Sequence, residues 1–230
     1  MNFTGFPRNL QDFLFELQFN NSRGKAPEYK DRYKQIMTEP LTRMHADLAG
    51  VAMEVDASIE VKPSRCISKM YNDLRYSADT PIKEYVYLRF REATPREENV
   101  PGLFFDMGID AYRFGMCVYR FGTAGMGAIR EHVLEHPGDW ERALHALDYI
   151  QIKGEDYKKD HFPQLPDGPL KSFLNKRSFY AAAERPVNEV VYTPKLVEEV
   201  ADGFRKAGPL FRLCEQALDE AERKEEQGWR

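Results

Sequence analysis

Apolar residues near the start of the chain recur with the spacing of a helix. They fall at positions i, i+3, i+4 and i+7: Leu10, Phe13, Leu14 and Leu17. This spacing places them on one face of a 3.6-residue repeat and predicts an amphipathic helix. A second, longer helical pattern runs from 29 to 55, and Pro40 interrupts it. Because proline lacks an N–H and clashes with the preceding turn, we expect a kink there or two abutting helices.

Further along the chain the apolar positions alternate. Four short segments, rich in β-branched and aromatic residues, are bounded by Pro, Gly or Asp: 61–71, 84–91, 103–109 and 113–121. Alternation with a period of two residues predicts strands, and the connection at 109–112 is short enough for a hairpin. We therefore predict an antiparallel meander with one face covered by helices.

The remaining chain returns mainly to helical patterns. We expect helices at 126–135, 139–147 and 170–175, a strand-like segment at "SFYAAA", and a last helix opened by Thr193-Pro194 and broken at Gly208-Pro209. There is no internal repeat and no Ser/Gly-rich linker. The prediction is a single α+β domain over residues 1–230, with a central, largely antiparallel sheet packed against N- and C-terminal helices.

Composition excludes several classes of protein. The 42% hydrophobic and 30% charged residues are typical of a globular chain. No apolar run approaches the roughly 18 residues of a membrane span, and the N-terminal residues do not read as a secretory signal. The three cysteines are widely spaced, so they do not form a disulfide framework. We expect a cytoplasmic protein that does not bind membranes.

Charge is distributed unevenly along the chain. The net charge is −4. However, residues 61–96 hold eight basic side chains (Lys62, Arg65, Lys69, Arg75, Lys83, Arg89, Arg91, Arg96) and four acidic ones (Asp73, Asp79, Glu84, Glu92). The acidic whole disfavours bulk nucleic-acid binding, whereas the basic segment suits an anionic partner.

This basic segment also carries the strongest candidate site. Alternation puts Lys69 and Tyr71 on one face of the first strand, and Tyr85, Tyr87, Arg89 and Arg91 on one face of the second. Arginine forks bind phosphate or carboxylate bidentately, and tyrosine rings offer stacking surfaces. We predict a pocket for a small anionic, phosphorylated ligand. Its candidate residues are Lys69, Tyr71, Asp73, Arg75, Lys83, Tyr87 and Arg89, with Lys158, Lys159, Lys176 and Arg177 closing it from the C-terminal half.

Within this candidate site Arg75 is the preferred anchor, because its planar fork takes two oxygens at once. The alternative without a binding function is that these basic side chains cover an exposed sheet face and pair with neighbouring carboxylates. A functional alternative is an interaction module that binds a partner protein or single-stranded nucleic acid through the same face. The sequence indicates neither a reaction nor an oligomeric state.

The remaining sequence patterns are better explained by structural roles than by catalysis or metal binding. Gly122, Gly125 and Gly127 fit a permissive turn and match no phosphate-loop motif. His132 and His136 share a helical face but have no evident further ligands. Cys117 is interpreted as a core thiol, and Asp106 with Asp110 as ordinary carboxylates at a strand end. The sequence therefore predicts no metal and no cofactor.

Four stretches of the sequence carry a family resemblance: "FNNSR" followed by "EPL", "MYNDLRYSADTPIK", "FGMCVY", and "GEDYKK…LNKRSFY…ADGFRKAGPLFR". Almost from end to end, the chain resembles the bacterial family catalogued as domain of unknown function 2461. Relatives read like R-I-Y-R-D-T-R-F-S-K-D-K-T-P-Y-K through the second stretch. Here Asn72 replaces an arginine and Ala78 a lysine. The resemblance implies no established activity, and these departures imply a diluted cationic site.

Overall fold

The computed structural model describes residues 1–73, 75, 80–93 and 98–228. Within these residues the chain forms a six-stranded antiparallel sheet with the order β1-β2-β3-β4-β6-β5. The strands are β1 (Ile59–Glu60), β2 (Val86–Glu92), β3 (Val100–Met107), β4 (Ala111–Tyr119), β5 (Gln151–Lys153) and β6 (Tyr180–Pro186). The α-helices are α1 (Leu10–Asn20), α2 (Ala26–Tyr33), α3 (Glu39–Val55), α4 (Pro63–Cys66), α5 (Thr123–Glu135), α6 (Pro137–Ala146), α7 (Pro169–Leu174) and α8 (Lys195–Glu226). The predicted α+β fold is confirmed.

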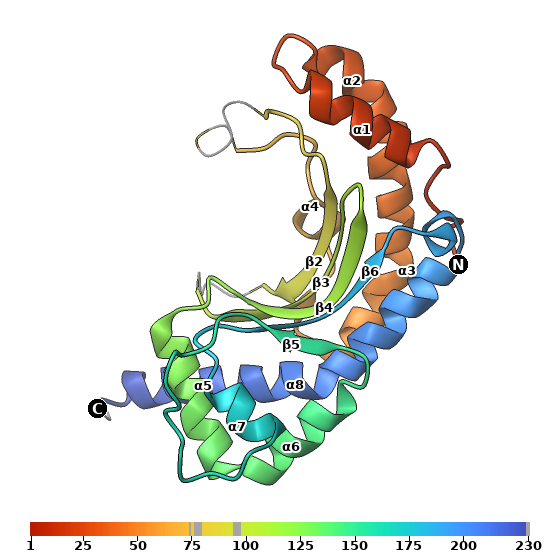
Figure 1. Cartoon of the computed structure of the whole chain (residues 1–230). Helices are drawn as coiled ribbons and strands as arrows, with labels where there is room; N and C mark the ends of the chain where they lie inside the picture. The colour runs from red at the N-terminus through yellow and green to blue at the C-terminus, as the bar shows by residue number, and fades with distance from the viewer. Residues whose placement is uncertain (74, 76–79, 94–97, 229–230) are drawn as a thin grey trace.

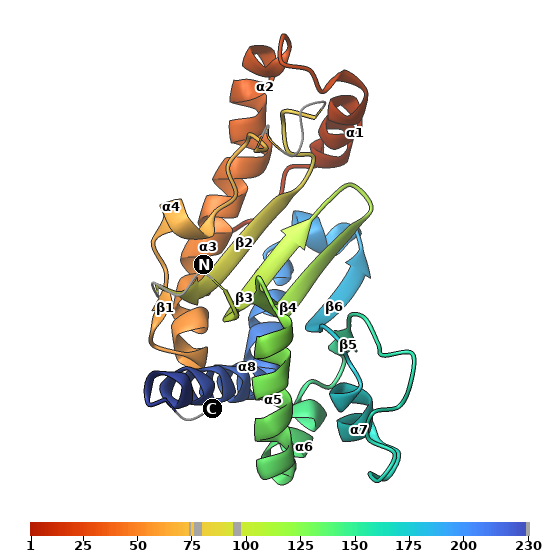
Figure 2. The same ribbon diagram turned by 90° about the vertical axis from the view of Figure 1, so that its left-hand side faces the viewer.

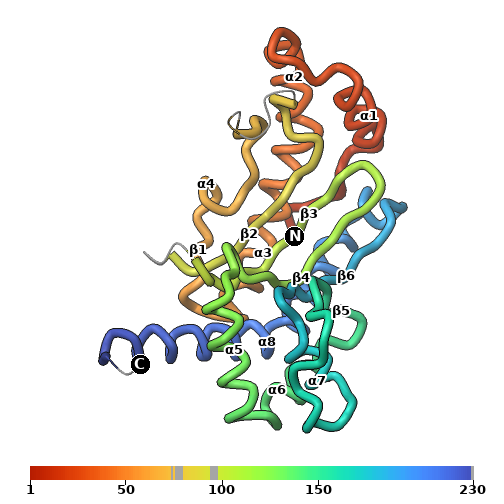
Figure 3. Tube along the Cα trace, turned by 60° about the vertical axis from the view of Figure 1, so that its left-hand side comes forward, coloured from red at the N-terminus to blue at the C-terminus, as the bar shows by residue number. Residues whose placement is uncertain are grey.

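The centre of the sheet is the predicted meander. β2 pairs with β3, and β3 pairs with β4 across a tight turn in which the Gly108 N–H donates to the Ala111 carbonyl. The sheet extends beyond the predicted range, because β6 pairs with β4 and β5 pairs with β6 (Figure 3). Strands from the C-terminal half of the chain therefore complete the sheet.

The predicted strand at 61–71 is wrong. The segment instead forms α4 and then makes only isolated bridges, Ile67 with Leu88 and Tyr71 with Ile82. Pro63 has no N–H to donate to a strand neighbour, and its fixed φ suits the first turn of a helix. The Arg65 and Cys66 N–H groups donate to the Lys62 carbonyl and close that turn.

Proline acts differently in the two long helical stretches. Before Pro40, α2 runs through a π-helix, η1 (Lys34–Thr38), into α3, so the expected irregularity takes the form of a π turn. The wider turn accommodates the proline ring next to the preceding carbonyls.

In α8, the expected break at Gly208-Pro209 is wrong, since the helix is continuous around Pro209. A proline inside a helix costs about 3 kcal/mol. Full burial of the adjacent Leu210 and Phe211 offsets this cost at about 1.5–3 kcal/mol each.

The start of α8 also differs from the sequence pattern. Pro194 directly precedes the helix, and the Thr193 hydroxyl donates to the Val190 carbonyl, so it caps no helical N–H. The short 3-10 helix η2 (Glu189–Tyr192) lies immediately before it. Thr193 therefore closes the preceding turn.

One face of the sheet is covered by α3 and α8 (Figure 1). Its side chains are large and fully buried, including Leu88, Phe90, Phe105 and Phe114. The Phe90 ring contacts Phe204 of α8 edge to face at 5.9 Å and stacks with His45 of α3 at 5.3 Å. At Gly203 a Cβ would lie 2.4 Å from two Phe114 ring carbons, so this ring rests directly on the α8 backbone. The core of the protein lies between these layers.

The opposite face of the sheet is concave, and none of the described helices covers it (Figures 1 and 2). α1 and α2 project beyond it at one end, and α5 and α7 at the other. Two glycines lie at the centre of this face: Gly102 on β3 and Gly115 on the neighbouring strand β4. At Gly115 φ is +150°, and a Cβ would lie 2.0 Å from the Ala181 carbonyl oxygen. Glycine marks positions where a strand bends or another backbone approaches closely, and both conditions apply here.

The Gly203–Phe114 contact predicts a steric test. Gly203→Ala should destabilise the fold by about 1–3 kcal/mol through overpacking. Each kcal/mol corresponds to a fall of roughly 2–4 °C in Tm for a chain of this size. Gly50→Ala in α3 is the matched control: its Cβ meets nothing within 4 Å. There, alanine should stabilise the helix by up to about 1 kcal/mol. Equal Tm changes in the two variants would contradict the assigned contact.

A carboxyl pair links the end of α3 to α8. Burial, and then the neighbouring Asp56 carboxylate, raise the pKa of Glu215 to about 8. Burial also opposes ionisation of Asp56, but hydrogen bonds from Ser58 and Glu215 outweigh it and lower the Asp56 pKa. At neutral pH the pair therefore holds one proton, on Glu215.

This proton predicts a pH dependence of stability. Between the ordinary glutamate pKa of 4.5 and about 8, the folded chain binds a proton at Glu215 that the unfolded chain releases. The Glu215 contribution to stability is therefore complete below the lower value and is lost as pH rises through this window. Glu215→Gln, which stays neutral, should gain Tm relative to the unsubstituted protein between about pH 5 and pH 9, by a few degrees. Parallel Tm curves for the two proteins would exclude the shared proton.

Candidate functional site

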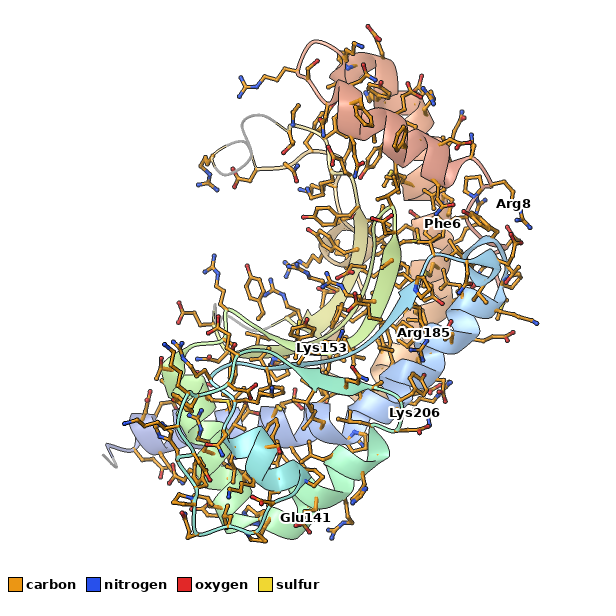
Figure 4. All side chains as sticks on the ribbon, viewed as in Figure 1. Phe6, Arg8, Glu141, Lys153, Arg185 and Lys206 are labelled. Carbon is orange, nitrogen blue, oxygen red and sulfur yellow. The ribbon has the colours of Figure 1, made fainter. Side chains whose placement is uncertain are left out.

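The hollow face of the sheet contains a cleft of about 780 Å³. We call it the sheet cleft. Side chains of β2, β3, β4 and β6 line it, together with the β3–β4 turn and the segment before β6. Figure 4 shows side chains from the sheet projecting into this hollow, with Lys153 near its β5 border. The aromatic lining consists of Tyr85, Tyr87, Phe104, Phe121, Phe179 and Tyr180.

A row of paired charges crosses the floor of the sheet cleft. The register places Tyr87, Asp106, Arg113 and Glu184 side by side on four strands. Arg113 donates to both Asp106 carboxylate oxygens at 2.9 Å, and this hydrogen bonding raises the pKa of the arginine. Glu184 forms an ion pair with Lys153 at 2.5 Å, which lowers the glutamate pKa. These side chains neutralise one another and fix the floor.

Two guanidinium groups on β2 have no such partner in the part of the chain that the structure describes. Arg89 lies over the Tyr87 ring at 4.5 Å, and Arg91 lies over the Tyr119 ring at 4.3 Å. Neither has a carboxylate within 4.0 Å among the described residues. Arg91 reaches Tyr119 of β4 across Gly102 of β3, whose missing side chain leaves that path open. Stacking on aromatic rings holds both forks in place and leaves their N–H edges for other acceptors.

Cys117 stands in register with Arg91 across Gly102 and lines the sheet cleft, so the prediction of a core thiol in an apolar setting is wrong. Its position on β4, two residues from Gly115, puts it on the hollow face of the sheet. Burial raises the pKa of Cys117 to about 11, while Arg89 and Arg91 lower it only in part. The thiol is therefore protonated at neutral pH and is not an activated nucleophile.

One end of the sheet cleft is bordered by α1. The Gln11 side chain donates to the Ile109 carbonyl in the β3–β4 turn, and the Asn21 side chain donates to the Ile82 carbonyl before β2. Between these contacts, Phe15 and Phe19 are exposed on α1, with ring centroids 4.8 Å apart. The two hydrogen bonds attach α1 to the sheet at this end.

Of the residues proposed from sequence, Tyr87 and Arg89 line the sheet cleft. Lys69, Tyr71, Asp73 and Arg75 are exposed in the segment before β2. Arg75 pairs with Asp73 at 2.6 Å, and this pairing lowers the pKa of Asp73 to about 2. Asp79 and residues 76–78 lie outside the described residues. Ligand contact by this segment stays a prediction.

Lys83 takes a different position from the other proposed cations. Its side chain is buried, and its ammonium group donates to the Tyr71 carbonyl oxygen. Burial, and then the charge of Lys69, lower its pKa. The contact ties the two arms of the segment before β2 together and directs this cation toward the backbone.

The two halves of the chain do meet at the sheet cleft, through Tyr180 and Glu184 of β6. Lys176 pairs with Asp156 at 2.9 Å and does not line the cleft. Arg177 pairs with Glu155 at 3.4 Å and lines a neighbouring hollow of about 320 Å³ that shares Phe121 and Ser178 with the cleft. Lys158 and Lys159 are exposed.

Sequence reasoning missed three cleft residues, Arg113, Tyr180 and Glu184. It also missed Lys153, which pairs with Glu184, and the pairing of Asp106. The pairing of Asp106 depends on the position of the hairpin turn. The turn expected at 109–112 would place Asp106 opposite Gly115, whereas the observed turn, closed between Gly108 and Ala111, places it opposite Arg113. The other residues depend on the pairing of β6 with β4 and β5, which no local pattern specifies.

The described residues contain no group of three His, Cys, Asp or Glu side chains that could hold a metal ion. The Nδ1 atom of His132 accepts a hydrogen bond from the Trp140 indole at 2.9 Å, so this histidine is used in packing. None of the helices, over the residues described, combines the length and apolar character that crossing a bilayer requires.

The fold and the site define an α+β protein whose uncovered sheet face carries a cleft of small-molecule size. The sequence matches the family described as "Conserved hypothetical protein (DUF2461)" over residues 9–212, and the chain belongs to this family. The match spans every strand of the sheet and most of α8. No curated protein and no solved structure matches the chain.

Proposed function

We propose that the protein binds a small anionic ligand in the sheet cleft, with the anion at Arg89 and a planar or apolar part on the aromatic lining. The observation that carries this proposal is the pair of stacked guanidiniums, Arg89 and Arg91, without a described carboxylate partner. A fork held against a ring presents two N–H groups in fixed geometry, which matches phosphate or carboxylate oxygens.

The charge distribution supports the same assignment. Arg113 is matched by Asp106, and Lys153 by Glu184. The surplus positive charge is therefore concentrated on β2, where aromatic side chains replace part of the surrounding water. Charge interactions are stronger in such a site than on an exposed surface. A ligand with its anion toward β2 gains most from this asymmetry.

The dimensions favour a small molecule over a polymer. A volume of about 780 Å³ lies within the usual range for ligand pockets, roughly 300–1,000 Å³. The lining of the cleft includes the β3–β4 turn with Ile109, and Phe121 and Phe179 from the segments after β4 and before β6. Binding of single-stranded nucleic acid or a partner protein through the same face is the alternative function.

A thermal-shift screen tests the proposal, with nucleoside monophosphates, sugar phosphates and aromatic carboxylates as probes. A ligand at about 100 times its Kd stabilises the folded state by about 2.7 kcal/mol. For a chain of this size that is a Tm rise of roughly 5–10 °C. Arg89→Ala should weaken binding of any hit by at least about tenfold, because a hydrogen-bonded charge contributes about 1.5–3 kcal/mol. Arg205→Ala is the matched control, since Arg205 pairs with Glu54 on the helical layer.

A second variant shifts affinity in the opposite direction. Asp106→Asn is nearly isosteric and removes the carboxylate that neutralises Arg113, so anion affinity should rise by several-fold. A hit whose affinity is unchanged in both Arg89→Ala and Asp106→Asn binds elsewhere, and the proposed site is then wrong. No hit from the panel, together with anisotropy binding of mixed oligonucleotides at about 50 mM salt, would favour the alternative function.

A further inference from the structure

A second hollow, of about 370 Å³, adjoins the sheet cleft at the β1 edge of the sheet. We call it the edge pocket. Arg89 lines both spaces, so its guanidinium group stands at their boundary. The other charged side chains of the edge pocket are Glu60, Arg65, Arg91 and Glu92. Three guanidinium groups thus surround a space next to the proposed anion position.

We propose that the edge pocket is a subsite for a second phosphoryl group, so that the ligand of the sheet cleft is a diphosphate ester. This inference rests on the proposed function, because it extends a ligand already anchored at Arg89. The edge pocket would hold the terminal phosphoryl group between Arg65 and Arg91, while Arg89 contacts the inner one.

The arrangement of the three arginines suits a ligand with two linked anionic groups. Arg89 and Arg91 are two residues apart on one face of β2, which separates their Cα atoms by roughly 6.8 Å. Arg91 stands opposite Glu60 of β1 in the strand register, and Arg65 lies on α4 just beyond that strand. The guanidinium groups therefore follow a line from the sheet cleft to the sheet edge. A single phosphate at Arg89 does not occupy this whole line.

The carboxylates of the edge pocket explain why the second group must be linked to the first. Glu60 accepts from the Lys62 N–H at 2.8 Å and lies 3.8 Å from the Arg65 guanidinium, so it helps to position that arginine. Together with Glu92 it also offsets part of the positive charge. A free anion is bound weakly in such a mixed environment. A phosphoryl group linked to one at Arg89 binds there at high effective concentration.

Inorganic phosphate and pyrophosphate are suitable probes, because they differ by the second phosphoryl group and carry no ring. In calorimetric titrations at about 50 mM salt, pyrophosphate should bind at least about tenfold more tightly than phosphate. Arg65→Ala should remove most of this preference and leave phosphate affinity unchanged. Arg89→Ala should weaken both. Arg65→Lys keeps the charge without the fork and should retain part of the preference.

Controls separate this effect from a loss of charge or of folding. Arg205→Ala removes one positive charge on the helical layer and should not change the preference. Each variant is compared by thermal melting before titration. Equal affinities for the two anions, or a preference that survives Arg65→Ala, would overturn the edge-pocket assignment. If phosphate binding depends on Arg89 and pyrophosphate gains nothing, only this inference fails. If neither anion binds, the inference fails, and the ring-bearing probes then decide the proposed function separately.

Discussion

The contact between Phe114 and the backbone of α8 at Gly203 is the constraint on which the rest of the structure depends. A glycine at this point of the helix lets the ring of a central strand approach the helix axis more closely than any side chain would permit. This close approach commits one face of the sheet to α8, and α3 completes the cover with His45 stacked on Phe90. Both long helices therefore lie on the same side. The opposite face is left to the loops and shorter helices at the two ends of the sheet, which border it without covering it.

The shape of the uncovered face follows from the same asymmetry. Toward the helices the strands carry Phe90, Phe105 and Phe114, whereas toward the hollow side the central positions are Gly102 and Gly115. A sheet with large side chains on one face and glycines on the other bends toward the glycine side. The missing side chains also leave room above the backbone, which Arg91 uses to reach Tyr119. Core packing and the position of the guanidinium groups therefore have one cause.

Much of the fold could be predicted from the sequence where the determining signal is local. The alternation in β2 correctly separates Tyr87 and Arg89 from the buried Val86 and Leu88, because side-chain direction in a strand depends only on parity. The predictions failed where another interaction outweighed the local pattern. The segment after β1 alternates like a strand, but Pro63 turns it into a helix. Pro209 should interrupt α8, but burial of its neighbours keeps the helix continuous. The contributions of Tyr180 and Glu184 to the candidate site depend on long-range strand pairing, for which a single sequence contains no local signal.

The structure also separates two sets of cations that look equivalent in the sequence. Arg75 has a side chain that is 79% exposed and is neutralised by Asp73 two residues away, so water and its neighbour screen its charge. Arg89 and Arg91 lie on aromatic rings in the hollow of the sheet without a described carboxylate partner. Asn72, which replaces an arginine of the family pattern, lies in the segment before β2 together with Arg75. There the Asn72 amide donates to the Thr80 carbonyl at 2.6 Å and holds the two arms of the segment together. Loss of an arginine at this position therefore changes the segment before β2 and leaves the guanidinium groups of the sheet cleft in place.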